Sequence, residues 1–160
     1  MQTIMITGCS SGFGLETARY FLEQGWKVIA TMRAPQEGVL PASDRLRLVR
    51  LDVTSAQSIA EAIAEAGEID VLVNNAGVGM LNALEGAPRE AIANLFATNT
   101  LGTIAMTQAV IPRFRARRSG TIVNITSAVT LQPMPLLAVY TASKAAVNAF
   151  TESLALELLA

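Results

Sequence analysis

Tyr140 and Lys144 lie four positions apart in the segment VYTASKAAV, residues 139–147, and are the side chains best suited to acid–base chemistry. If this segment is helical, as its pattern predicts, both side chains project from one face with Cβ atoms roughly 5–6 Å apart. A free phenol has a pKa of about 10, and a neighbouring ammonium group favours its ionised form. Such a pair can act as a general acid/base near neutral pH. The alternative is an aromatic residue at a helix start beside a solvated lysine.

Other common catalytic groups are missing from the sequence. The chain contains no histidine and a single cysteine, Cys9. A Ser-His-Asp triad, a conventional zinc site and a disulfide within the chain are therefore excluded, and we predict no metal site. We interpret Cys9 as a small residue that fills a loop. Acid–base chemistry in this chain must then use other groups, such as a phenol and an amine.

A glycine-rich stretch, TGCSSGFG at residues 7–14, follows a predicted strand and precedes a predicted helix. Its spacing does not match G-x-G-x-x-G, but its residue types suit a phosphate-binding loop, because glycines allow close backbone approach and a helix N-terminus offers free N–H groups. Ser10 and Ser11 can donate hydrogen bonds to phosphate or simply cap the helix. The alternative for the whole stretch is a tight turn. The residues predicted to bind the ligand here are Gly8, Ser10, Ser11, Gly12, Phe13 and Gly14.

Short β-rich runs alternate with longer stretches of helical period, a pattern typical of βαβ units. The predicted strands are residues 3–7, 26–31, 46–53, 69–77 and 121–126. The predicted helices are residues 15–25, 58–67, 88–117 with a bend, and 139 to the end. The strands are apolar on both faces, as parallel strands covered by helices must be. We therefore predict one α/β domain over residues 1–160: a Rossmann-type, doubly wound parallel sheet with helices on both faces and its ligand beyond the carboxyl ends of the strands.

Three helix boundaries carry sequence signals. Gly25 is predicted to end the first helix. Thr54 is predicted to cap the second, with Gln57 completing a capping box. Pro88 suits the first turn of the third.

Composition and charge exclude several classes of protein. With 51% apolar residues, 16% charged residues and a net charge of −1, the chain is suited to bury a core rather than to bind nucleic acid broadly. A short basic run is interpreted as cations at a helix C-terminus: Arg113, Arg115, Arg117 and Arg118. No long apolar stretch or signal-peptide pattern is present. We expect a cytoplasmic protein without a membrane span or a nucleic-acid partner.

These motifs together resemble the short-chain dehydrogenase/reductase family. TGCSSGFG resembles the family's T-G-x-x-x-G-x-G loop, and Tyr140 with Lys144 matches Y-x-x-x-K. Between them, in the family's order, lie Asp52 and Val53 after the third strand, the NNAG motif with Asn75, Ala76 and Gly77, then Asn99, and Ser127 at the end of the fifth strand. The resemblance covers residues 7–144.

The resemblance implies an oxidoreductase that transfers a hydride between NADP(H) and an alcohol or carbonyl substrate. Tyr140 would be the general acid/base and Lys144 would stabilise its phenolate. Ser127 would hydrogen-bond the substrate oxygen, and Asn99 would hold a water that relays protons to Lys144. Asp52 and Val53 would contact the adenine, and Asn75, Ala76 and Gly77 would border the cofactor. Tyr140 and Lys144 would also contact the cofactor. The alternative is a non-catalytic nucleotide-binding module or an inactive fragment.

The preference between NADP and NAD depends on the end of the second strand. An NAD site usually has an acidic residue there, which binds the ribose hydroxyl. This chain has no acid from residue 26 to residue 36 and places Arg33 there instead. A guanidinium suits a 2′-phosphate, so we predict NADP over NAD, with NAD still possible. The alternative is a surface arginine.

The segment between Ser127 and Tyr140 is almost wholly apolar and contains two prolines. We predict that it lines a site for an apolar alcohol, aldehyde or ketone, of lipid, retinoid, steroid or xenobiotic type. The alternative is that it packs beneath further chain. Family members continue past the Tyr-Lys helix, so we expect the chain to be C-terminally incomplete and residues 121–126 to form an exposed apolar edge. The resemblance also implies a homodimer or homotetramer through the helices near residues 98–117 and 140–159.

Overall fold

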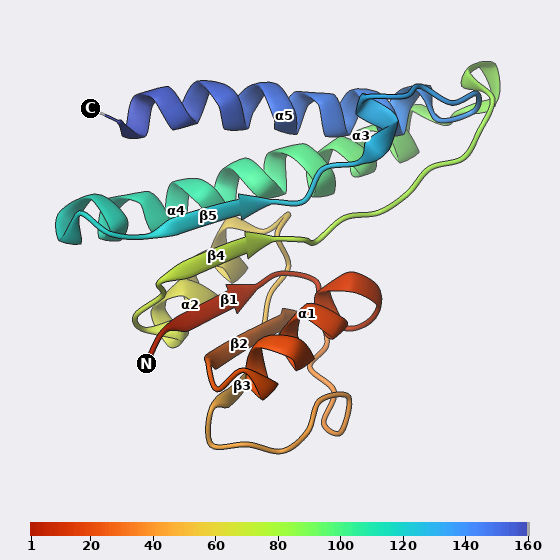
Figure 1. Cartoon of the computed structure of the whole chain (residues 1–160). Coiled ribbons are helices and arrows are strands. Elements are labelled where there is room, and N and C mark those ends of the chain that lie inside the picture. Colours follow the sequence, from red (N-terminus) through yellow and green to blue (C-terminus); the bar gives the residue numbers. More distant parts are fainter. Residues whose placement is uncertain (160) are drawn as a thin grey trace.

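A computed structural model describes residues 1–159, which form one five-stranded parallel sheet in the order β3-β2-β1-β4-β5 (Figure 1). The strands are β1 (Thr3–Ile6), β2 (Lys27–Met32), β3 (Leu46–Arg50), β4 (Val71–Asn74) and β5 (Thr121–Asn124). The order reverses direction between β1 and β4, as in a Rossmann-type doubly wound sheet. The predicted fold class is confirmed. Four strands end earlier than predicted and β2 ends one residue later, so residues 75–77 and 125–126, which were predicted as strand, continue beyond the carboxyl edge of the sheet.

The sheet separates two apolar clusters because side chains of each strand alternate between its faces. Ile4 and Ile6 pack with Ala18 and Leu22 of helix α1 (Gly12–Glu23) on one face. Met5, between them, belongs to the cluster on the other face, which also contains residues of α2 (Ala56–Ala66) and α4 (Gly102–Arg117). Every strand that is central in the sheet is therefore covered on both sides, which explains the continuous apolar runs of the sequence.

The predicted helix at residues 88–117 is three consecutive helical pieces. It comprises α3 (Arg89–Phe96), the π-helix η2 (Ala97–Leu101) and α4. π-Turns inside longer helices are rare, and many of those that are found lie at functional sites. Where the sequence predicted one helix with a bend, the structure has a π-turn, and this π-turn includes Asn99.

The helix boundaries only partly follow the sequence signals. Gly25 lies just past the end of α1 with φ +81°, as predicted for a C-terminal stop. The prediction of a capping box at Thr54 is wrong. The Thr54 hydroxyl and N–H both donate to Asp52 Oδ1, and Ser55 is the N-cap of α2. Pro88 is the N-cap of α3, one residue before the position predicted for it. Local hydrogen bonding of Thr54 thus outcompeted the capping pattern.

The strand β5 lies at the edge of the sheet, as expected. Val123 and Ile125 are 39% and 38% exposed. Helix α5 (Ala138–Leu158) lies on the same side as α4 (Figure 1), and its Thr151 accepts a hydrogen bond from Asn124 Nδ2 at 2.8 Å. The apolar edge predicted for residues 121–126 is therefore present in the described residues.

The arginine run occupies the end of α4 as predicted. Arg115 and Arg117 are in its last turn, and Arg118 follows with φ +52°. Arg113 donates to the carbonyls of Ile63 and Gly67 at the end of α2, at 3.1 and 2.8 Å. These cations satisfy helix C-terminal carbonyls, in agreement with the structural interpretation of the run.

Among residues 1–159, no helix is both long enough and apolar enough to span a membrane.

Candidate active site

A cavity of about 680 Å³ lies at the carboxyl ends of β1, β2, β3 and β4. It is the place where an open α/β sheet binds its ligand. Most residues predicted to contact a cofactor line it: Gly8, Ser10, Ser11, Gly12, Phe13, Arg33, Asp52, Val53, Asn75, Ala76 and Gly77. The fold thus collects into one cavity residues that lie far apart in the sequence.

Gly14, by contrast, supports the loop from within instead of lining the cavity. A Cβ at Gly14 would lie 2.3 Å from the Gly8 carbonyl oxygen and 2.4 Å from Asn75 Nδ2. Asn75 Nδ2 donates to the carbonyl oxygens of Thr7 and Gly8, at 2.9 and 3.2 Å. The glycine loop therefore packs tightly against the segment that follows β4, and a side chain at position 14 does not fit.

The N-terminus of α1 opens toward the cavity. Ser11 is the N-cap residue, but its side chain makes no capping hydrogen bond within residues 1–159. Gly12 has φ +59° and open space around its Cβ position. Backbone N–H groups at such an uncapped helix start are suited to anionic oxygens, because the helix dipole places partial positive charge there. The described residues therefore fit the pyrophosphate of a dinucleotide at this end of the cavity.

The opposite wall of the cavity carries Asp52, Val53 and Arg33. The Thr54 hydroxyl, which donates to Asp52 Oδ1 at 2.7 Å, lowers the pKa of that carboxyl, and the Thr54 backbone N–H lowers it further. The charge of Arg33 contributes a smaller lowering of the Asp52 pKa. Asp52 is thus held ionised by its local hydrogen bonds, and Arg33 is an exposed cation at the cavity wall.

Lys144 reaches the cavity wall from behind Gly77. Its side chain is buried, and its Nζ donates to the carbonyl oxygen of Ile125 at 2.9 Å. A Cβ placed on Gly77 would lie 3.4 Å from Lys144 Nζ and 3.4 Å from Asn99 Oδ1. Burial lowers the pKa of Lys144 below its ordinary value. The amine, the Asn99 amide and the NNAG segment therefore meet at one point.

The four predicted catalytic residues are not among the residues that line the 680 Å³ cavity, and Ser127 lines a separate cavity of about 390 Å³ beyond β5. Asn99 is fully buried, and Tyr140 and Ser127 are partly buried. Ser127 follows β5 and accepts a long hydrogen bond of 3.4 Å from the Val129 N–H. Tyr140 lies in the first turn of α5, one turn before Lys144. No hydrogen bond joins the Ser127 and Tyr140 side chains within residues 1–159.

Several lining residues were not predicted from the sequence. They are Met32, Leu51, Thr54, Val78, Asn94, Ala97 and Thr98. Met32 ends β2 and Val78 follows the NNAG motif, so the rule that ligands lie beyond strand ends could have identified both. Residues 94, 97 and 98 belong to α3 and η2, and no local signal marks them.

Cys9 is close to the cavity but takes no part in its lining. It is fully buried, and its thiol donates to the Ile6 carbonyl oxygen at 3.2 Å. Burial raises the pKa of Cys9 to about 12. A neutral thiol is a poor nucleophile, which supports the interpretation of Cys9 as a loop filler.

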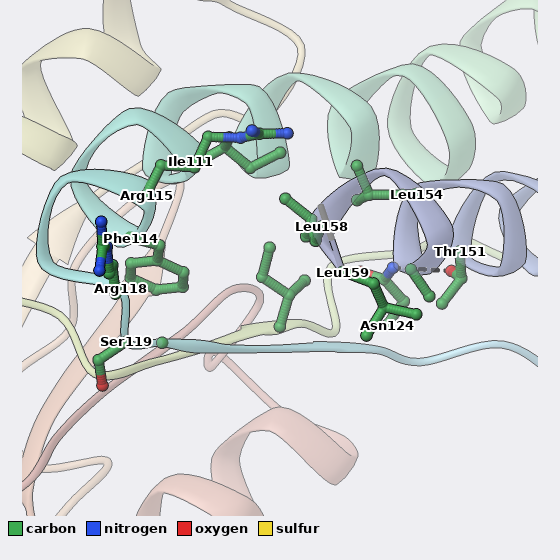
Figure 2. Close-up of a pocket in the computed structure, with 13 residues that line it drawn as sticks. Ile111, Phe114, Arg115, Arg118, Ser119, Asn124, Thr151, Leu154, Leu158 and Leu159 are labelled. Atoms are coloured by element: carbon green, nitrogen blue, oxygen red, sulfur yellow. Dashed lines mark hydrogen bonds between the residues drawn. The ribbon is translucent and has the colours of Figure 1, made fainter.

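A second cavity, of about 650 Å³, lies between the C-terminal parts of α4 and α5 and the strand β5 (Figure 2). Its walls are formed mainly by Ile111, Phe114, Leu154, Leu158 and Leu159. The polar pair Asn124 and Thr151 is already joined by a hydrogen bond (Figure 2). The cavity extends along β5 from Gly120 to Asn124, and its lining includes none of the residues predicted to act in catalysis or to bind a cofactor.

The comparisons with known proteins agree with this arrangement. A sequence model of the short chain dehydrogenase family matches residues 2–160. Retinol dehydrogenase 8 of Bos taurus is 42% identical over 170 residues, which cover 99% of this chain and 54% of that protein. The 3-ketodihydrosphingosine reductase of Bacteroides thetaiotaomicron is 42% identical over 161 residues, which cover 98% of this chain and 58% of that protein.

Among solved structures, the closed form of serine dehydrogenase complexed with NADP+ is 36% identical with a TM-score of 0.91. The match covers 98% of this chain and 66% of that one. This chain spans little more than half the length of the two curated relatives, at 54% and 58%. Sequence and fold agree, and the chain belongs to the short-chain dehydrogenase family.

Proposed function

We propose that this protein binds NADP(H) and catalyses hydride exchange between it and an apolar alcohol or carbonyl compound. The observation that carries the proposal is the contact of the buried Lys144 amine with the Gly77 wall of the 680 Å³ cavity. Among residues 1–159 no carboxylate forms an ion pair with this amine, and such burial is unfavourable for folding. The amine is therefore expected to serve chemistry. The nicotinamide, when bound, supplies or accepts the hydride.

The chain's own residues divide the remaining tasks. The N–H groups at the start of α1 hold phosphate, and Asp52 and Val53 border the adenosine end of the cavity. Tyr140 exchanges the proton with the substrate oxygen, and Lys144 supplies the positive charge that favours its phenolate. Ser127 donates a hydrogen bond to the oxygen on which negative charge develops. Asn99 takes part in the proton relay behind Lys144.

Arg33 is expected to determine the choice of cofactor. Replacing it with alanine would weaken NADPH binding by roughly 10- to 100-fold, because a charge-assisted hydrogen bond to a 2′-phosphate contributes about 1.5–3 kcal/mol. NADH binding would change little, since its ribose lacks that phosphate. Fluorescence titration of both nucleotides measures the effect, with Arg89→Ala, at the exposed start of α3, as the matched control. Equal affinity of the wild type for NADPH and NADH would contradict the assignment.

Two loops beyond the strand ends supply the apolar surface for a substrate. Leu81 is 72% exposed in the segment after β4, and Leu131, Met134 and Leu136 are 87%, 57% and 52% exposed between β5 and α5. The Asn82 N–H donates to the Leu136 carbonyl oxygen at 2.9 Å and so joins the two loops. These exposed apolar side chains support an apolar substrate, as do the names of the retinol and 3-ketodihydrosphingosine enzymes among the relatives.

A series of straight-chain 2-ketones tests the substrate class. Each methylene buried against this surface contributes about 0.8 kcal/mol, so kcat/KM is expected to rise about fourfold per carbon until the surface is filled. NADPH oxidation followed at 340 nm gives the rates. A preference for small sugars, or rates independent of chain length, would contradict an apolar substrate. Tight NADPH binding without turnover of any carbonyl would favour a nucleotide-binding module instead.

A further inference from the structure

We propose that Ser143 is a positioning residue, which connects the helix bearing Tyr140 and Lys144 to the π-helix that carries Asn99. The proposal rests on the proposed function, because it assigns to Ser143 the placement of that site's acid/base. Ser143 is fully buried immediately before Lys144. Its hydroxyl and its carbonyl oxygen both form hydrogen bonds with residues of the π-helix.

The direction of the hydrogen bonds is fixed by Val78. The Asn99 amide oxygen accepts from the Val78 N–H at 2.8 Å, and Asn99 Nδ2 donates to the Val78 carbonyl oxygen at 2.9 Å. A flipped amide would place Nδ2 against an N–H donor, so this orientation is the favourable one. The second hydrogen of Nδ2 then donates to Ser143 Oγ at 3.1 Å. Ser143 Oγ, already an acceptor, donates its own hydrogen to the Tyr140 carbonyl oxygen at 2.7 Å.

A second hydrogen bond also connects Ser143 to the π-helix. The Thr100 hydroxyl donates to the Ser143 carbonyl oxygen at 2.9 Å. Consecutive residues of a regular α-helix project in directions about 100° apart, yet Asn99 contacts the Ser143 hydroxyl and Thr100 its carbonyl oxygen. Both residues belong to the π-turn at Ala97–Leu101. The π-helix thus holds the second turn of α5 through two of its adjacent residues.

The connection ends at the wall of the cavity. Val78 directly follows Gly77, whose Cβ position is 3.4 Å from Lys144 Nζ. A shift of α5 along its axis would move Tyr140 and Lys144 together relative to the Gly77–Val78 segment. Misplacement of catalytic groups by about 1 Å can reduce rates by about 10²-fold. The Ser143 hydroxyl is thus placed to fix the distance between the acid/base pair and the cofactor side of the site.

Hydrogen exchange tests the connection without requiring activity. Ser143→Ala deletes the hydroxyl, and we expect the Val78 amide proton to exchange about tenfold faster, because the Asn99 amide that it donates to loses one of its anchors. Thr151→Val is the matched control. Its hydroxyl lies on the same helix, donates to the Val147 carbonyl oxygen and accepts from an asparagine amide, but it is two turns from Lys144. It is expected to leave Val78 exchange unchanged.

Unchanged Val78 exchange in Ser143→Ala would overturn the proposal, and so would equal acceleration in both variants. Ser143→Cys, which keeps a weaker donor of similar size, provides the same measurement if the alanine variant does not fold. Because exchange is measured on the chain itself, it decides the question even if the proposed oxidoreductase function fails.

A double-mutant cycle tests the catalytic consequence. Ser143→Ala is expected to lower kcat about 10- to 100-fold with little change in the KM for NADPH. In an Asn99→Ala background the same substitution is expected to have less than about a twofold effect, because the hydroxyl acts through that amide. Equal losses in the two backgrounds would show that Ser143 does not act through Asn99 and would overturn the positioning role.

Discussion

Replacing Gly14 with alanine is expected to lower the melting temperature by about 2–12 °C and to weaken NADPH binding at least about tenfold. The new Cβ would lie 2.3 Å from the backbone carbonyl oxygen of Gly8 and 2.4 Å from Asn75 Nδ2. Backbone cannot rotate away as a flexible side chain can, so α1 and the glycine loop must separate. Overpacking of this kind typically costs about 1–3 kcal/mol, and each kcal/mol lowers the melting temperature by about 2–4 °C in a domain of this size.

Helix propensity alone predicts the opposite sign. Gly14 is in the first turns of α1, and alanine is favoured over glycine inside a helix by about 1 kcal/mol. A thermal melt therefore separates the two effects by the direction of the shift. Gly79→Ala is the matched control, since its Cβ would meet no atom within 4 Å, and we expect its melting temperature to stay close to the wild-type value. A more stable Gly14→Ala variant would contradict the packing described for the glycine loop.

The fold was predictable because its signals are local and repeat along the chain. Runs such as TIMIT and WKVIAT are apolar on both faces, and this pattern is specific to parallel strands between two helical layers. Strand ends were less predictable, because the residue types of each segment do not show where strand pairing stops; β4 and β5 end at Asn74 and Asn124. The wrong cap at Thr54 has a different, local origin, because Asp52, two residues earlier, accepts both Thr54 hydrogen bonds.

The candidate site was predictable where a motif lies within one segment. Most residues of the glycine loop and the last three residues of the NNAG segment line the cavity. The hydrogen bond between Asn99 and Ser143 joins residues 44 positions apart, and no sequence pattern predicts a contact between residues so far apart. The Asn82–Leu136 backbone hydrogen bond likewise joins two loops that lie far apart in the sequence. Contacts of this kind depend on how the elements pack, which the periodicity of each element does not specify.

Replacing Tyr140 with phenylalanine is expected to lower kcat by about 10²–10⁴-fold, the usual contribution of a positioned general acid/base. The change deletes one oxygen and keeps the ring, so binding of NADPH is expected to remain within about twofold. Tyr20→Phe is the matched control, because Tyr20 is the other of the two tyrosines and is 58% exposed on α1. Steady-state rates with a hydrophobic carbonyl compare the variants, and the melting temperature of each checks that the fold is intact.

The pH dependence of the wild type adds a test of Lys144 as the partner of Tyr140. Burial lowers the pKa of Lys144 from 10.5, so its ammonium form is lost at a lower pH than that of an exposed lysine. Because the ammonium favours the phenolate, alcohol oxidation is expected to decline as pH rises through that lowered pKa. A rate in Tyr140→Phe above about a tenth of the wild-type rate would place the acid/base elsewhere. If the rate of alcohol oxidation declined only above pH 10.5, Lys144 would not be the group whose charge supports Tyr140.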